Sequence, residues 1–259
     1  MLVDSHCHLN SIDLADFNND LSQVLAQAKN NGVGHLLTVC VELSDYPLLE
    51  RIAAENPNIN ISAGVHPNIE MEIPVTKEML CDLAKNPSCI AIGETGLDYY
   101  RTLTDEAQEV QRERFRQHIR AALITSKPLI IHTRQAAEDT LLLMAEENAQ
   151  NIGGVMHCFA EDMDIARRAI DLNFYISFSG IVTFKNAIAL QEVARQIPLE
   201  RMLIETDSPY LAPVPFRGKQ NHPALVRHVA EAIAELRGMD FNEIAEITTD
   251  NFYKCFKIA

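Results

Sequence analysis

Eight short apolar segments alternate with amphipathic helical stretches along this chain, and the alternation restricts the fold more than any other feature. Most of these segments are near-continuous apolar runs, as expected for parallel strands that are covered on both faces. A repeated β-then-α order predicts a parallel sheet, which right-handed crossovers close into a barrel or leave open and doubly wound. The predicted strands are residues 2–5, 35–41, 59–65, 89–93, 129–131, 154–156, 174–178 and 202–205.

The length of the chain favours the closed form. Its 259 residues lie close to the roughly 250 that are typical of one α/β barrel. The first strand is not followed by the glycine-rich G-x-G-x-x-G that marks an open dinucleotide-binding sheet. We therefore predict a (β/α)8 TIM barrel that occupies residues 1–259 as a single domain. The predicted helices include residues 20–30, 48–55, 105–126, 222–237 and 241–256.

The composition indicates in which cellular compartment the protein is located. With 47% hydrophobic residues the chain can bury a full core, yet no apolar stretch approaches the roughly 20 residues that cross a bilayer. A targeting peptide begins with a basic segment followed by an apolar one, whereas this chain carries the acidic Asp4 among its first residues. The six cysteines include no Cys-x-x-Cys pair, so we expect them to be reduced and mostly structural. These features predict a cytoplasmic protein that does not bind membranes.

The net charge restricts the class of partner. A formal charge of −14 repels polyanions and argues against a protein that coats duplex nucleic acid through many phosphate contacts. It is compatible with an enzyme that grips one or two phosphates through divalent ions, which reverse the local potential. If the substrate is DNA, ends or single-stranded regions are the expected targets.

Polar residues end nearly every predicted strand, and barrel enzymes place their chemistry at that rim. In an extended strand, residues i and i+2 point to the same side. The imidazoles of His6 and His8 can therefore converge on one ion while Cys7 faces away. Four of the histidines and two of the carboxylates at this rim suit two ions with nitrogen and oxygen ligands. The strand-end residues are His6, His8, His66, Glu94, His132, His157, Glu205 and Asp207.

The other histidines are assigned to surface or capping positions. His35 opens a strand at the opposite rim, His118 and His228 lie within helical stretches, and His222 begins one. His66 lies at the correct rim but is followed by a proline. A substrate-phosphate or supporting role and a purely structural role both remain open for it.

Several motifs together resemble one known family. The chain is similar to the TatD family of metal-dependent deoxyribonucleases, within the wider amidohydrolase-like superfamily, from its first strand to its last. The motifs are Asp4-Ser5-His6-Cys7-His8-Leu9, Gly64-Val65-His66-Pro67, Gly93-Glu94-Thr95-Gly96-Leu97-Asp98-Tyr99, His132-Thr133-Arg134, His157-Cys158-Phe159, Ser179-Gly180, Glu205-Thr206-Asp207-Ser208-Pro209-Tyr210-Leu211, Arg217-Gly218-Lys219 and Thr249-Asp250-Asn251-Phe252.

The resemblance implies a barrel hydrolase with two metal ions. It assigns His6, His8 and Asp207 to one ion, His132 and His157 to the other, and Glu94 as the bridge between them. Many relatives outside this family use a carboxylated lysine as the bridge, and this chain offers Glu94 instead. Four imidazoles favour Zn, Mn, Co or Ni over Mg, although availability in the cell often decides.

As a hypothesis, two ions activate a shared water as hydroxide for exonuclease-like hydrolysis of a phosphodiester. Asp207 and Glu94 are the candidate catalytic residues, with Asp207 as general base and proton shuttle. Candidate substrate-binding residues are His66, Arg134 and Glu205, and Glu205 is also a candidate for orienting a histidine or a water. Further candidates for contact with phosphates or bases are Lys185, Arg217, Lys219, Tyr99, Tyr100 and Tyr210.

Two other readings stay open. The same centre can attack a carbonyl, so the substrate can be a carboxylic ester or amide, such as an aminoacyl-RNA ester or a lactone. A binding protein without turnover is the other class, although clustered charges without a use are unfavourable to bury. No obligate protein partner is expected.

Overall fold

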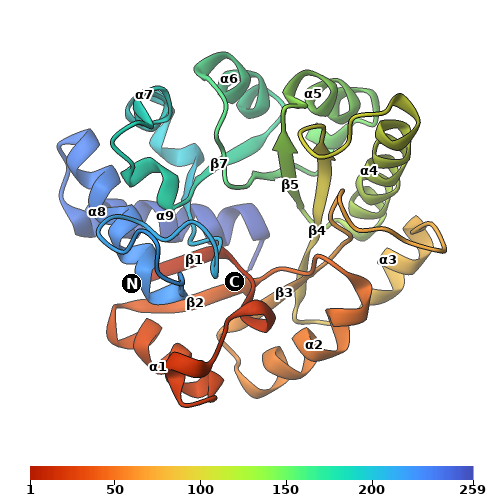
Figure 1. Cartoon of the computed structure of the whole chain (residues 1–259). Coiled ribbons are helices and arrows are strands. Elements are labelled where there is room, and N and C mark those ends of the chain that lie inside the picture. Colours follow the sequence, from red (N-terminus) through yellow and green to blue (C-terminus); the bar gives the residue numbers. More distant parts are fainter. Residues whose placement is uncertain (259) are drawn as a thin grey trace. The chain divides into compact units, whose positions relative to one another are not determined.

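Strands β1 to β8 pair in chain order within one parallel sheet, and helices alternate with them in the computed structural model, which describes residues 1–258 (Figure 1). This order confirms the predicted (β/α)8 TIM-barrel class. The strands are β1 (Leu2–Cys7), β2 (Val33–Thr38), β3 (Ile59–Ala63), β4 (Cys89–Asp98), β5 (Leu129–Arg134), β6 (Gly154–Met156), β7 (Phe174–Phe178) and β8 (Met202–Ile204).

The helices follow the strands with which they were expected to alternate. Predicted residues 105–126 form α4, which ends one residue early because Ser126 has a left-handed φ of 56°. The helices are α1 (Leu21–Asn30), α2 (Tyr46–Glu55), α3 (Lys77–Leu83), α4 (Asp105–Thr125), α5 (Ala137–Glu146), α6 (Met163–Asp171), α7 (Ile188–Gln196), α8 (Val226–Arg237) and α9 (Phe241–Phe256). Among residues 1–258, no helix is long and apolar enough to cross a bilayer.

Strand β4 is longer than the sequence pattern predicted. The expected strand stopped at residue 93, whereas β4 continues to Asp98 because its second half pairs with β5, with Gly96 opposite His132. Glu94 therefore lies inside a strand and not after one. Glu94 and Asp98 are four residues apart in that strand, a spacing that places both side chains on one face.

The chain divides into two compact units. The first unit comprises residues 1–38, 158–166 and 176–254, and the second comprises residues 39–157, 167–175 and 255–259. The expectation of a single domain over residues 1–259 stays a prediction.

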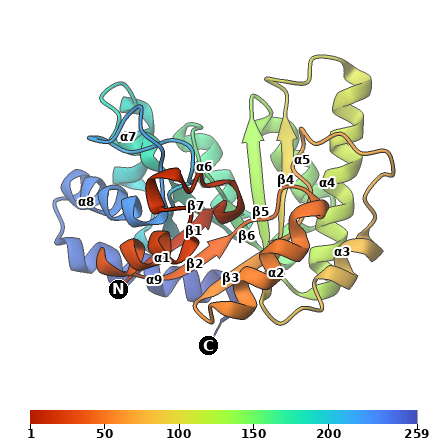
Figure 2. The ribbon, with the colours of Figure 1, turned by 60° about the horizontal axis from the view of Figure 1, so that its bottom comes forward.

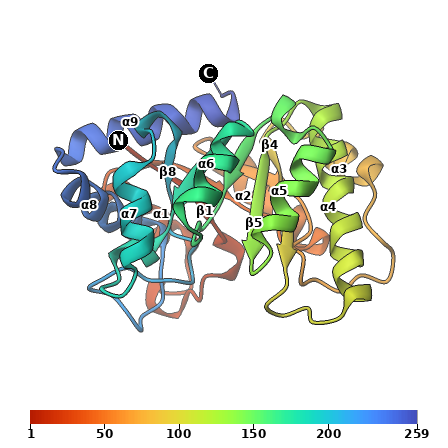
Figure 3. The same ribbon diagram turned by 90° about the horizontal axis from the view of Figure 1, so that it is seen from above.

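The first unit contains the parallel pairs β1–β2 and β7–β8. Val3 is in register with His35, and Ile176 is in register with Met202. Buried aliphatic side chains such as Leu203 form the core beneath helices α1, α7 and α8. Helix α7 lies beside α8 (Figure 3).

The second unit is built around β3, β4 and β5. Helix α4 packs against β4 and lies beside α3 (Figure 2). Thr104 begins α4 as its N-cap, accepting the Ala107 N–H at 3.3 Å, which satisfies one of the free donors of the first turn. Phe115 and Ile119 bury the inner face of α4.

Candidate metal centre

Three side chains of the first unit form a compact donor set, called here the β1 cluster: His6, His8 and Asp207. The Nε2 atoms of the two imidazoles are 3.2 Å apart. Oδ1 of Asp207 lies 3.3 Å from His8 Nε2 and 3.7 Å from His6 Nε2. All three residues are buried. Their side chains converge as the sequence pattern predicted, and metal binding by them stays a prediction.

The β1 cluster forms because the chain after β8 returns to pair with β1. The backbones of Cys7 and Ser208 form an isolated parallel β-bridge. The backbone N–H of Asp207 donates to His6 O at 2.9 Å. The Cys7 side chain points the other way and lies 3.4 Å from Leu37 O on β2. The two histidines therefore share the opposite side, as the i, i+2 spacing predicted.

Asp207 is held in an unusual backbone conformation by residues that the sequence reasoning missed. Its φ of 54° lies in the left-handed region, which is uncommon for a residue other than glycine. Asp4 Oδ1 accepts the Thr206 N–H at 2.8 Å, and Asn221 Nδ2 donates to Thr206 O at 2.8 Å. Asp4 and Asn221 thus fix the residue that precedes Asp207 and, through it, the turn that presents the carboxylate.

The second unit holds another donor set, the Glu94 cluster, in which Glu94 Oε1 faces three imidazoles. It lies 2.8 Å from His157 Nε2, 3.2 Å from His132 Nδ1 and 3.5 Å from His66 Nε2. Burial alone would raise the pKa of Glu94, but its interactions with His157, His66 and His132 outweigh burial and hold the pKa well below its usual range. Glu94 is therefore an anion, as a metal ligand must be.

His66 is held as a hydrogen-bond donor. Its Nδ1 accepts the backbone N–H of Asn68 at 3.1 Å, and burial lowers its pKa to about 4, so the ring is neutral with its proton on Nε2. A protonated Nε2 cannot ligate a metal, but it can donate to an anion. This agrees with the assignment of His66 to substrate and not to the ligand set.

Asp98 is a site residue that the sequence reasoning quoted within a motif but gave no role. Its carboxylate is buried, and Oδ2 lies 3.4 Å from His132 Nε2 and accepts Asn68 Nδ2 at 2.7 Å. A carboxylate on one nitrogen of an imidazole fixes the tautomer and leaves the other nitrogen as the ligand. The i, i+4 spacing from Glu94 would have placed Asp98 beside it, had β4 been predicted at its full length.

Glu205 is fully buried in the first unit. Its Oε1 accepts the backbone N–H of Cys158 at 2.6 Å. Cys158 has a left-handed φ of 44°, so Glu205 stabilises a tight turn directly after His157. This contact fits the orienting role that was one of its expected functions, and contact with substrate stays a prediction.

Two arginines lie over aromatic rings, one at the end of β5 and one in the loop after β8. In the second unit, exposed Arg134 has its guanidinium carbon 3.9 Å from the centre of the Tyr100 ring. In the first unit, Arg217 lies 3.7 Å from the centre of the Phe184 ring. Tyr210 is exposed and packs edge-on against His8, with ring centres 6.1 Å apart. These pairs offer positive charge and flat apolar surface together.

The remaining candidates have other surroundings. Lys185 is exposed, and Lys219 Nζ lies 6.0 Å from the centre of the Phe216 ring. Tyr99 is partly buried, with its hydroxyl donating to Asp139 at 2.7 Å, so it offers less surface for stacking than Tyr100. Contact of any of these side chains with substrate stays a prediction.

Two of the four histidines assigned to the surface or to caps were assigned wrongly. His118 and His35 are buried. His118 accepts the Val65 N–H on Nε2 at 2.9 Å, and its Nδ1 lies 2.8 Å from Arg114 O. A histidine inside a helical stretch can pack inward when both nitrogens find backbone partners, which sequence alone does not reveal.

Both donor sets fit a divalent ion. Ligands about 2.0 to 2.1 Å from a tetrahedral ion are separated from one another by about 3.3 Å. The distances of 3.2 to 3.7 Å within the β1 cluster, and of 2.8 and 3.2 Å from Glu94 Oε1 to His157 and His132, lie near that value. Imidazole and carboxylate donors suit Zn, Mn, Co or Ni, and Mg less well.

A parallel α/β barrel with imidazole and carboxylate donors at its strand ends defines a metal-dependent hydrolase. The family described as "TatD related DNase" matches residues 3–257. The chain belongs to this TatD family, which confirms the predicted resemblance.

Named relatives agree with this class. "Uncharacterized metal-dependent hydrolase YcfH" of Escherichia coli (strain K12) is 48% identical over 257 residues, which cover 99% of this chain and 96% of the relative. "Uncharacterized metal-dependent hydrolase YabD" of Bacillus subtilis is 41% identical over 261 residues and the full length of both chains. The crystal structure of YJJV, a TatD homolog from Escherichia coli, superposes with a TM-score of 0.90 at 26% identity, covering 100% of this chain and 98% of that one.

Proposed function

We propose that this metal-dependent hydrolase cleaves phosphodiester bonds of DNA, at strand ends or in single-stranded regions, with one divalent ion held by each donor set. The observation that carries the proposal is the pair of clusters, each combining imidazole nitrogens with a carboxylate. The family description, which names a DNase, supports DNA as the substrate.

The ions supply Lewis acidity and an acidified water when bound. In this proposal His6, His8 and Asp207 would hold one ion, His132 and His157 would hold the other, and Glu94 would serve both. The bridging role of Glu94 and the number of ions stay predictions.

Asp207 is the proposed general base. Its side chain keeps 13% of its surface exposed, which allows water to approach the carboxylate. Its left-handed turn fixes the direction of the carboxylate, so the proton acceptor is positioned before substrate binds. A proton taken onto Oδ1 or Oδ2 of Asp207 can then pass to the leaving oxygen.

His66 and Arg134 are the proposed contacts to substrate phosphate. His66 carries its proton on Nε2, 3.5 Å from Glu94 Oε1, and so offers a neutral donor beside the Glu94 cluster. Arg134 adds a cation, and Tyr100 beneath it adds a face on which a base can stack. With a net charge of −14, binding depends on a few such contacts and not on a broad basic surface.

The test is a substrate panel on protein loaded separately with Mg, Mn, Co, Zn or Ni. Single-stranded and duplex DNA, labelled at the 5′ or the 3′ end, are incubated beside carboxylic esters, a lactone, an aminoacyl-RNA and amides. Shortening of labelled DNA from an end, faster on single strands, is the expected result. DNA left whole with every metal, together with turnover of an ester or amide, would replace the nuclease assignment by the carbonyl alternative. Tight binding of DNA without turnover of any substrate would support a binding protein.

A further inference from the structure

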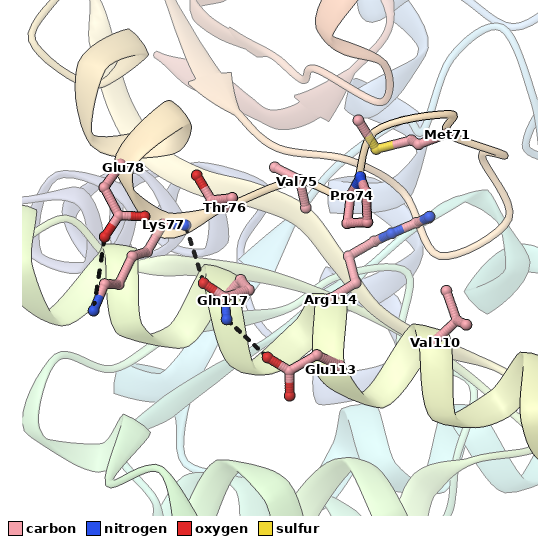
Figure 4. A pocket seen from close by; sticks show the side chains of 10 residues that line it. All are labelled: Met71, Pro74, Val75, Thr76, Lys77, Glu78, Val110, Glu113, Arg114 and Gln117. Atoms are coloured by element: carbon pink, nitrogen blue, oxygen red, sulfur yellow. Dashed lines mark hydrogen bonds and ion pairs between the residues drawn. The ribbon is translucent and has the colours of Figure 1, made fainter.

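A pocket outside both donor clusters lies in the second unit, between α4 and the loop that precedes α3 (Figure 4). Its volume is about 580 Å³, within the roughly 300 to 1,000 Å³ of small-molecule sites. Apolar side chains from both elements line it: Met71, Pro74 and Val75 from the loop, and Val110 from α4. An apolar lining of this size can hold a hydrocarbon group of a ligand.

Arg114 is the half-buried cation of this lining, and part of its hydrogen-bonding capacity is unused. Its Nη1 donates to His66 O at 2.9 Å and to Pro67 O at 3.1 Å. Among residues 1–258, none accepts a hydrogen bond from its Nε or Nη2. Figure 4 shows the guanidinium reaching from α4 toward the loop with Met71 and Pro74. A half-buried guanidinium with free donors is a site for an anion, because both donors lie in one plane and match two oxygens.

The other charged groups of the pocket are more exposed than Arg114 and lie near groups of opposite charge. Lys77 Nζ lies 3.8 Å from Glu78 Oε1. Glu113 accepts Gln117 Nε2 at 2.7 Å and lies 3.8 Å from Arg116. Two carboxylates at the rim repel a dianion more strongly than a monoanion, so a single negative charge on the ligand is favoured.

We propose that this pocket binds a small monoanionic carboxylate with a hydrocarbon chain. The carboxylate accepts hydrogen bonds from Nε and Nη2 of Arg114, and the chain lies against Met71, Val75 and Val110. The ligand belongs to a site separate from the donor clusters, so the proposal does not depend on the hydrolytic function.

Octanoate is the probe, titrated into the full-length protein carrying ¹³C-methyl methionine. We expect a saturable shift of the Met71 methyl signal. This signal is assigned as the one that is missing from the spectrum of a Met71→Leu variant. Octanamide keeps the chain but lacks the charge, and octyl phosphate carries a second charge. Both should bind at least about tenfold more weakly than octanoate, because charge-assisted hydrogen bonds are roughly twice as strong as neutral ones and the rim carboxylates disfavour a dianion.

A matched pair of variants tests the location. Val110 lines the pocket and is 60% exposed, whereas Ile124 is 62% exposed on the same helix and lies outside it. Val110→Glu should weaken octanoate binding about tenfold or more by repulsion, and Ile124→Glu should leave the affinity within about twofold of the parent value. Circular dichroism verifies that both variants keep the fold.

Three results would overturn the proposal. One is the absence of a saturable Met71 shift with octanoate up to about 10 mM. A dissociation constant above that concentration would be weaker than expected even for a fragment-sized ligand. Another is equal affinity for octanoate and either octanamide or octyl phosphate. The third is an affinity of the Val110→Glu variant for octanoate that equals the affinity of the parent protein.

Discussion

His132 Nε2 lies 3.4 Å from Asp98 Oδ2, a buried carboxylate on the same strand as Glu94. The opposite nitrogen, Nδ1, lies 3.2 Å from Glu94 Oε1. Burial lowers the pKa of His132, but the nearby carboxylates of Asp98 and Glu94 outweigh burial and raise it. With a divalent ion bound, a proton held on Nε2 by Asp98 would leave the Nδ1 lone pair of His132 for the ion.

Replacement of Asp98 by asparagine should weaken metal binding at this cluster. Loss of a carboxylate that supports a histidine ligand typically lowers metal affinity about 10- to 100-fold. Isothermal titration of metal-free protein with Zn measures the change. Asp139→Asn is the matched control, because Asp139 binds the Tyr99 hydroxyl and is partly exposed. Equal Zn affinity in Asp98→Asn and the parent would contradict this supporting role.

Replacement of Asp207 by asparagine should abolish proton transfer while leaving the fold intact. Removing a general base lowers turnover by about 100- to 10,000-fold. Steady-state rates on the preferred substrate, with metal content measured in parallel, separate lost catalysis from a lost ligand. Asp250→Asn, an exposed acid on α9, serves as the control. Turnover at the parent rate by Asp207→Asn would remove Asp207 from the mechanism.

Gly96 should tolerate no side chain. A Cβ at this position would lie 2.0 Å from His132 O, and its φ is 133°. Gly96→Ala should therefore destabilise the protein by about 3 kcal/mol or more through backbone overlap. Gly32→Ala isolates the conformational part, because Gly32 also has a positive φ of 85° but has nothing within 4 Å of the added carbon. About 1 to 2 kcal/mol is expected there. Urea unfolding measures both, and equal losses would show that close approach at Gly96 is not the constraint.

His118 should make the free energy of unfolding sensitive to acid. Burial lowers its pKa from 6.5 to about 4, so the unfolded chain binds a proton that the folded state excludes. The stability from neutral His118 is fully present above pH 6.5 and is lost as the pH falls toward 4, by up to about 3 kcal/mol.

His118→Gln removes this proton linkage. The difference in unfolding free energy between parent and variant, measured on metal-free protein, should therefore shrink between pH 7 and pH 4. Metal-free samples are needed because ligand histidines titrate in the same range. Parallel pH profiles for the two proteins would mean that His118 has the same pKa in the folded and the unfolded states.

The sequence predicted the strands and the strand-end donors because these depend on local patterns. A continuous apolar run marks a strand buried on both faces, and His6 and His8 share a side through the period of two. The residues that support the donors follow no such pattern. Asn221 fixes the Asp207 turn from 14 positions further along, through a hydrogen bond to Thr206 O. Such contacts are set by packing between segments distant in sequence.

The end of β4 illustrates a second limit. Glu94 interrupts the apolar run, so the pattern suggested that the strand stopped before it. Pairing with β5 carries the strand to Asp98, because polar residues at the rim are compatible with backbone pairing. Asp98 was missed for this reason, and the same error hid its relation to His132.

The two separate donor sets should each bind one divalent ion. Metal content after loading and desalting, measured by inductively coupled plasma mass spectrometry, tests it most directly. The parent should retain about two ions per chain. The double variant His6→Ala with His8→Ala should retain about one, as should His132→Ala with His157→Ala, and the combination of all four should retain none. A parent that retains no metal under any loading condition, or double variants that retain the full complement, would contradict the account.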